Sequence, residues 1–449
     1  MQLPVAFSAD AARSLGGPDW LVERRLAALD RFAAAPPPPL DEDLWRYGRI
    51  GELDLDRYVP TGSSDAAGPE PVLDAGEWPE VARLLELVGE RSGLALVVDG
   101  QVATSDLAPG ASAAGVRLGA LTDEAAGAAV LDCLPLLNGE TGKEEHLPDP
   151  FDHLADAFCA DALVLSVPAG ARLAHPVIIV HVLGTRAGAD LAPAMFPRTI
   201  VDVGEGAEAG VIELLVSGDE AMLVVPTVDL LAADGANLTY ATIQQLGARS
   251  WQLAHQRARA GRDAMFRSFT ASLGADYARF RTESVLAGKG GSAELLAAYL
   301  GDRKQVHDFR TLQEHGAPRT ISDLVFKGAV GGTARSVYSG LIRMRKGAKG
   351  ATAFQTNRNL VLSDGAHADS VPNLDIEEND VKCSHASAVG QIDPEQRFYL
   401  ESRGVPPEAA ERLILLGFFE DLWQRITLPG VREHLAASVA GRLKAVTGG

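Results

Sequence analysis

Short apolar runs, separated by corners of small residues, fill most of the chain beyond residue 94. The runs have the length and the aliphatic, β-branched content of strands; examples are 94–98, 163–167, 177–183, 211–216 and 238–243. A glycine followed by a small residue recurs between these runs and after the last of them. Glycine permits the chain to turn tightly at such corners. Among these corners are Gly170-Ala171, Gly206-Ala207, Gly235-Ala236, Gly274-Ala275 and Gly332-Thr333. This pattern predicts a coil of short stacked strands, although a β-sandwich would leave similar signals.

Helical spacing of apolar residues marks both ends of the chain. Near the start it runs from Trp20 to Phe32, and four prolines at 36–39 end it. Helical patterns return beyond residue 394. We therefore predict four segments: an N-terminal helical region at 1–93, a mixed connecting segment at 94–160, a β-coil core at 161–393 and a C-terminal helical domain at 394–449.

The helix predicted after Pro406-Pro407 has two apolar stripes. One stripe comprises Leu413, Ile414, Phe418 and Leu422. The other comprises Leu415, Leu416, Phe419, Trp423 and Ile426. A helix with two apolar faces is either buried on both or keeps one face for a partner.

Composition narrows the classes of function. The chain has 449 residues, 46% of them hydrophobic, which is enough for a large core and more than one substructure. A formal charge of −19 argues against nucleic acid as a partner, because a phosphate backbone would be repelled. Three cysteines provide no disulfide framework, no apolar run is long enough to cross a membrane, and no secretion signal is seen. We therefore expect a cytoplasmic protein.

Cys383 and His385 are the strongest candidates for chemistry. In an extended strand side chains alternate, so Val381, Cys383 and His385 share one face. A thiol and an imidazole on one face can bind a metal or an iron–sulfur cluster, but either site usually needs four ligands. A second chain, or a distant segment such as the one holding His367, would have to supply the others. The alternative is a small apolar cysteine packed in a β-core beside a hydrogen-bonded histidine.

Other polar candidates favour structural roles. Cys133 and Cys159 lie in apolar contexts typical of a core, and His307 and His315 fit hydrogen bonding on a strand and a corner. The basic run Arg343, Arg345, Lys346 and Lys349 is typical of a solvated rim. The chain lacks a phosphate-binding loop, a nucleophile elbow, a zinc-protease motif and a dinucleotide fingerprint. It therefore has no nucleotide site and is predicted to be a binding or scaffolding protein, not an enzyme.

Several motifs resemble the SufB/SufD family of iron–sulfur cluster assembly scaffolds. Residues 354–363 resemble that family's "Q-x-x-R-N-L-L-L-S" rung, and 372–376 its "P-x-L-E-I". Residues 381–390 match "V-x-C-S-H-G-A-x-x-G" except for Ala386, and 398–404 match "F-Y-L-x-S-R-G". Trp45-Arg46-Tyr47 resembles the N-terminal "E-x-W-R-Y" of the SufD branch. The resemblance runs from residue 42 to about 420 and is closer to SufD than to SufB.

The resemblance implies a mainly β fold: a right-handed parallel β-helix core flanked by N-terminal and C-terminal helical regions. It implies a non-catalytic scaffold that pairs with a SufB-like subunit, forms a possible homodimer when isolated, and binds a SufC-type ABC ATPase. Cys383 and His385 would then help to hold a transient iron–sulfur cluster shared with SufB. The apolar stripe containing Leu415, Phe419 and Trp423 would be the partner interface for the ATPase.

Two rival functions remain open at this point. A SufB-like role as primary cluster carrier is disfavoured because SufB has a cysteine in the strand equivalent to 355–362, where this chain has none. SufB also has a cysteine where this chain has Leu400. A β-helical polysaccharide lyase or hydrolase would need an export signal and aromatic sugar platforms, and only 6% of the residues are aromatic.

Overall fold

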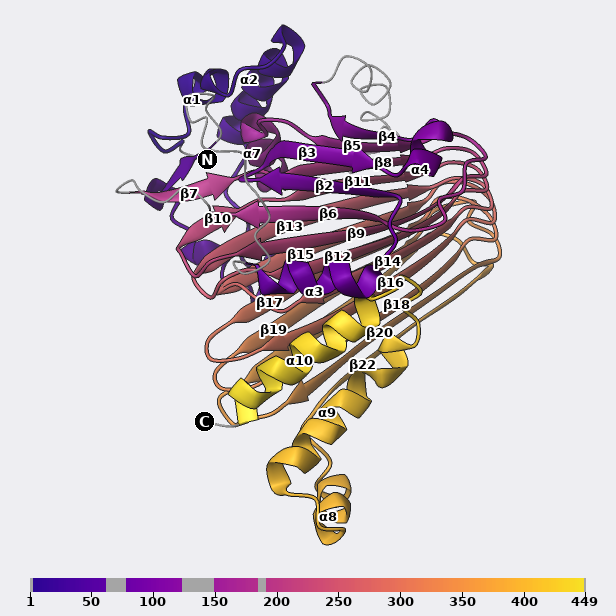
Figure 1. Ribbon diagram of the computed structural model, residues 1–449. Coiled ribbons are helices and arrows are strands. Elements are labelled where there is room, and N and C mark those ends of the chain that lie inside the picture. The colour runs from indigo at the N-terminus through magenta and orange to yellow at the C-terminus, as the bar shows by residue number, and fades with distance from the viewer. Residues whose placement is uncertain (1–2, 62–77, 123–148, 185–190, 448–449) are drawn as a thin grey trace.

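Two long β-sheets face each other and form the centre of the computed structural model, which describes residues 3–61, 78–122, 149–184 and 191–447 (Figure 1). The first sheet has, in spatial order, β4 (Arg117–Ala120), β5 (Leu163–Val167), β8 (Arg198–Val203), β11 (Thr227–Ala232), β13 (Ser250–Ala260), β15 (Tyr277–Leu286), β17 (Val306–His315), β19 (Arg335–Met344) and β21 (His367–Ile376). Three short strands join its margin: β1 (Tyr58–Pro60), β7 (Ala192–Met195) and β10 (Met222–Val224).

The second sheet has the intervening strands. In spatial order they are β3 (Gln101–Leu107), β2 (Gly93–Val98), β6 (Val177–Leu183), β9 (Glu208–Ser217), β12 (Asn237–Gln245), β14 (Met265–Ser272), β16 (Ser292–Gly301), β18 (Ile321–Val330), β20 (Ala351–Val361) and β22 (Val381–Gly390). From β11 onward the chain alternates between the sheets, and each strand pairs in parallel with the strand two places on. The fold is therefore a parallel β-solenoid, which confirms the predicted mainly β coil.

Alternating residues fill the space between the sheets. In β20 the residues Ala351, Ala353 and Gln355 are buried, while Phe354 between them is exposed on the outer face. Apolar side chains dominate the interior along most of its length, and aromatic rings stack across successive coils: the centroids of Phe280 and Phe309 are 5.3 Å apart. Each such pair adds roughly 0.5–1.5 kcal/mol beyond the burial of its area.

Helices are present at both ends of the chain, as predicted, and helices cover both outer faces of the solenoid (Figure 1). The first sheet is covered by the N-terminal region and by α7, and the second sheet by α3, α9 and α10. The helices are α1 (Ala9–Ser14), α2 (Asp19–Ala34), α3 (Pro79–Val88), α4 (Pro109–Ala113), α7 (Pro150–Phe158), α8 (Pro394–Ser402), α9 (Pro407–Trp423) and α10 (Val431–Thr447), with 3-10 turns η1 (Ile50–Glu52) and η2 (Leu55–Arg57). None of the described helices combines the length and the apolar character needed to span a membrane. The four segment boundaries stay a prediction.

Candidate shared site at the open end of the solenoid

The solenoid ends in two strands that have a neighbour on one side only. In the described part of the chain β21 pairs with β19 and β22 pairs with β20, and no further strand follows (Figure 1). Inward-facing residues of this last coil are consequently left uncovered: Leu374, Ile376 and Val389 are 39%, 47% and 47% exposed. An unpaired strand edge with apolar residues beside it is a template for pairing with another chain.

Cys383 and His385 both lie on β22, in this uncovered last coil. Their register partners on β20 are Ala353 and Gln355, which face the interior and are buried. Cys383 and His385 therefore lie on the inward face, with Cα atoms roughly 6–7 Å apart at strand spacing. Cys383 is half-buried against the small apolar cluster around Ile342 and Ala353, while His385 is exposed.

Burial raises the pKa of the Cys383 thiol. The thiol is therefore protonated near neutral pH in the isolated chain, and a weak nucleophile. A metal ion would have to displace this proton, because the thiolate is the ligand.

The geometry brings together two candidate ligands, whereas a cluster is normally held by four. Among the described residues no group of three or more histidine, cysteine, aspartate or glutamate side chains is arranged to hold a metal ion. His367, considered as a third ligand, begins β21, and its Nε2 atom lies 3.2 Å from Oδ1 of Asp369. Nearly the whole of β21 separates His367 from the corner that leads to Cys383, so the fold does not bring them together.

A family model described as "SUF system FeS cluster assembly, SufBD core domain" matches residues 185–418, a span that includes Cys383 and His385. The chain belongs to the SufBD family. It is 38% identical over 265 residues to a SufBD family iron–sulfur cluster assembly protein of Mycobacterium tuberculosis, covering 55% of this chain and 67% of that protein. It is 31% identical over 294 residues to the iron–sulfur cluster assembly protein SufD of Escherichia coli, covering 65% and 69% of the two chains. SufD of Bacillus subtilis is 29% identical over 217 residues, covering 48% and 50%.

The partner interface predicted for this SufBD chain on Leu415, Phe419 and Trp423 needs correction. All three side chains are buried in the chain's own core, against the outer face of the second sheet. The ring of Trp423 lies 6.1 Å from that of Phe269 on β14 and stacks on Phe419 at 5.5 Å. They anchor α9 and cannot also present an open face.

Exposed apolar side chains lie instead on α8 and at Leu413 of α9, which is 50% exposed. Phe398 and Tyr399 on α8 are 71% and 58% exposed, and Leu413 on α9 belongs to the other apolar stripe. In Figure 1, α8 and the adjoining end of α9 extend beyond the body of the solenoid. The ion pair of Arg397 with Glu411, at 2.6 Å, links α8 to α9.

The remaining sequence candidates occupy structural positions. Cys133 lies outside the described residues. Cys159 is buried, donates its thiol hydrogen to the carbonyl of Asp161 at 2.9 Å, and burial raises its pKa to about 12. His307 and His315 lie in the solenoid interior, hydrogen-bonded to Ser272 and to Thr320 and Ser322. Arg343 is buried and paired with Asp375 at 2.9 Å, so the predicted solvated rim is wrong at that residue.

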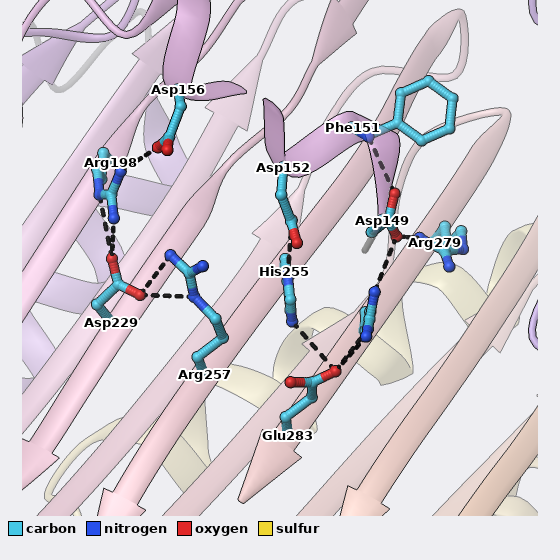
Figure 2. Close-up of polar contacts among 11 residues, drawn as sticks. Asp149, Phe151, Asp152, Asp156, Arg198, Asp229, His255, Arg257, Arg279 and Glu283 are labelled. Carbon is cyan, nitrogen blue, oxygen red and sulfur yellow. Dashed lines mark hydrogen bonds and ion pairs between the residues drawn. The ribbon is translucent and has the colours of Figure 1, made fainter. Parts of the chain in front are cut away.

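A buried network of charges under α7 was not anticipated (Figure 2). Three aspartates on or just before α7 reach basic residues on three strands of the first sheet, β8, β13 and β15. Asp156 and Asp229 bind Arg198, Asp149 binds Arg279 at 2.7 Å, and Asp152 lies 2.6 Å from the Nδ1 atom of His255. The spacing 149, 152 and 156 puts the acids on one side of the helix. Their partners are more than forty positions away, so sequence alone does not reveal them.

His255 makes this network sensitive to pH. Burial by itself lowers the pKa of His255, but the carboxylates of Asp152 and Glu283 outweigh burial and raise it. A raised folded-state pKa means that the stabilisation is complete below about pH 6.5, the unfolded value, and is lost as the pH rises through the folded value. We expect the melting temperature to fall more steeply on the alkaline side of pH 7 in the wild type than in His255→Gln.

The exposed His367 provides the matched control for that experiment, since His367→Gln should leave the wild-type slope unchanged. Identical pH profiles for the wild type and His255→Gln would show that His255 is not charged in the folded chain.

Proposed function

We propose that this chain is the non-catalytic, SufD-like scaffold subunit of a cytoplasmic SUF complex. In this proposal a SufB-like subunit pairs with the open end of the solenoid, and a SufC-type ATPase docks on the C-terminal helices. The observation that carries the proposal is the position of Cys383 and His385. They are a thiol and an imidazole on the inward face of a terminal strand, and no other strand in the described part of the chain pairs with its second edge.

The iron–sulfur cluster is cargo in this proposal. The Cys383 thiol and the His385 imidazole would provide two ligands, and the partner would complete the set, because clusters are normally held by four. The raised pKa of Cys383 fits a ligand that binds only when a metal displaces its proton. A site completed by two chains is empty whenever they separate, which suits transient holding and release.

The interior of β20 supports the SufD-like role over the SufB-like role. At the position where SufB would carry a cysteine, this chain has amides: Asn357 donates to the hydroxyl of Tyr299 at 3.0 Å and accepts from Asn359 at 2.8 Å. These buried amides have their hydrogen-bonding needs met within the solenoid and offer no thiolate. The carbohydrate-active alternative has no support from the family to which the chain belongs.

The uncovered apolar residues of the last coil support pairing with a second solenoid. Leu374, Ile376 and Val389 would be buried if another chain continued the two sheets in register, and the free edges of β21 and β22 would be satisfied. A second copy of this chain could do the same in the absence of SufB, which accounts for the expected homodimer of the isolated protein.

The ATPase is proposed to dock on the exposed side of α8 and α9. We expect the double variant Phe398→Asp and Tyr399→Asp to weaken binding of a SufC-type ATPase by about tenfold or more, because aromatic residues dominate interface energetics. Biolayer interferometry with the purified ATPase measures this. Val5→Asp, at an exposed position on the N-terminal region, is the matched control.

Phe419→Asp serves as the opposite comparison. Its side chain is buried, so the substitution should destabilise the chain by about 3 kcal/mol or more instead of selectively affecting docking.

Full ATPase affinity in the double variant Phe398→Asp and Tyr399→Asp would exclude the exposed side of α8 and α9 as the docking surface.

Co-purification from native extract tests the proposal as a whole. A SufB-like chain and an ABC-type ATPase should accompany this protein in stoichiometric amounts. Recovery of this chain with neither the SufB-like chain nor the ATPase would contradict the scaffold role.

A further inference from the structure

A cavity of about 320 Å³ lies on the outer face of the first sheet, and its floor reaches the terminal strand β21. Strands β15, β17, β19 and β21 form its floor, and the segment around Asp43 and Leu44 forms its roof. A volume of this size accommodates a small organic molecule. Nothing in the proposed scaffold role uses this cavity.

Leucines make one part of the lining apolar. Leu312 and Leu341 are register partners on adjacent strands, and Leu44 comes from the N-terminal region. They provide surfaces against which a flat or aliphatic body could pack. Ser339, two residues before Leu341 on the same face, leaves room beside them.

Three arginines provide the polar part, but they are not equivalent. Arg310 is fully occupied: it binds Asp308 and donates to the carbonyls of Asp43 and Arg46. Arg281 is bound to Glu283 at 2.6 Å, within the network under α7. Arg343 is bound through Nε to Asp375 at 2.9 Å, and that carboxylate is 41% exposed.

Arg281 and Arg343 each keep a buried donor atom without a hydrogen bond. In the described part of the chain the Nη1 atoms of both are buried and unsatisfied. Their nearest carboxylate oxygens lie 3.5 Å and 3.8 Å away, on Asp149 and Glu314, which is too far for a good hydrogen bond. Buried donors without a hydrogen bond are unusual in native structures, and a bound water molecule or anion is one way to satisfy them.

The cavity lining also contains two carboxylates, those of Glu283 and Asp43, and they do not make it unsuitable for an anion. Glu283 is held by Arg281 and lies 3.6 Å from the Nε2 atom of His255, so its charge is already compensated. The carboxylate of Asp43 belongs to an exposed residue, where solvent and salt screen its charge, and Nδ2 of Asn373 lies 3.5 Å from it. The two carboxylates do not form a metal site, because the described residues contain no suitable group of three metal-binding side chains.

We propose that this cavity binds a small organic anion. Its apolar body lies among Leu44, Leu312 and Leu341, and its carboxylate or phosphate is bound by Arg343, with Arg281 at the opposite wall. Arg343 is placed for this role, because it follows Leu341 by two residues and so shares its face of the strand. Such a ligand would join the N-terminal region to the solenoid through Leu44.

Isothermal titration of the full chain with four probes tests the site. 4-Phenylbutyrate and phenyl phosphate carry an aromatic body and an anion, 4-phenylbutyramide is the neutral counterpart, and inorganic phosphate has no apolar body. We expect both aromatic anions to bind, and the amide and inorganic phosphate to bind at least about tenfold more weakly, the usual effect of losing a charged hydrogen bond or an apolar contact. The stronger of the two anions identifies the acid group that the site prefers.

Two variants locate the binding. Arg343→Gln should reduce affinity for the aromatic anions about tenfold, and Ser339→Phe, which fills the cavity without removing a charge, should abolish binding. Arg249→Gln, at an exposed arginine in the turn before β13 and outside the cavity lining, is the matched control and should bind normally.

The proposal is overturned if neither aromatic anion binds at millimolar concentration. It is equally overturned if inorganic phosphate binds as tightly as they do, or if Ser339→Phe, folded by its melting temperature, binds like the wild type.

Discussion

A chain carrying both Cys383→Ala and His385→Ala should still fold and join the SUF complex, but it should deliver clusters at about a tenth of the wild-type rate or less, as loss of metal ligands typically causes. The fold should survive because both residues lie on a terminal strand, where Cys383 is half-buried and His385 is exposed. Cluster delivery should fail because the partner would be left with an incomplete set of ligands. Anaerobic transfer to an apo-ferredoxin, followed by circular dichroism, measures the rate.

The neighbouring residue gives the control for this experiment. Ser384 is exposed and points to the other face of β22, so Ser384→Ala should transfer clusters like the wild type. Unchanged delivery by the double variant, in a complex of normal composition, would rule out a ligand role for both residues.

Replacing Leu374 and Ile376 with lysine should separate the chain from its SufB-like partner, lowering the affinity about a hundredfold. Two lysine side chains placed in an apolar junction would cost about 3 kcal/mol in total, at the low end for buried unpaired charges. Both residues are partly exposed in the isolated chain, so its own stability should change little. Sedimentation velocity of the mixed subunits measures the affinity.

The control for this second experiment is Leu87→Lys. Leu87 is 38% exposed on α3, on a helix that covers the outside of the solenoid, and should not affect pairing. Wild-type association of the Leu374 and Ile376 variant would mean that the partner does not dock on the open end.

The position of the candidate site follows from the sequence for a simple physical reason. Strand alternation is local, so the shared face of Cys383 and His385 can be read from their spacing, and the helical pattern beyond residue 394 indicates that the strands end nearby. The structure agrees on both points, with β22 as the last strand and α8 following it. Whether a partner completes the site depends on a second chain. The sequence of one chain contains no information on how the two chains are arranged.

The orientation of α9 could not be read in the same way. Both of its stripes are apolar, and only the tertiary fold decides which positions are buried. One stripe packs on the second sheet together with Leu422 of the other stripe, while Leu413 is exposed. Phe269 and the rest of the second sheet's outer face, about 150 positions earlier in the chain, pack against Phe419 and Trp423. The network under α7 and the cavity beneath Leu44 are hidden for the same reason, since each joins segments that are distant in sequence.

Pulsed electron paramagnetic resonance of the reduced cluster, in a complex where only this chain carries ¹⁵N-histidine, tests the central claim most directly. If the open end of this solenoid supplies half of a shared site, a ¹⁵N coupling from a bound imidazole will be present and will vanish in His385→Ala. A cluster without such a coupling, or one whose coupling persists in His385→Ala, would contradict it.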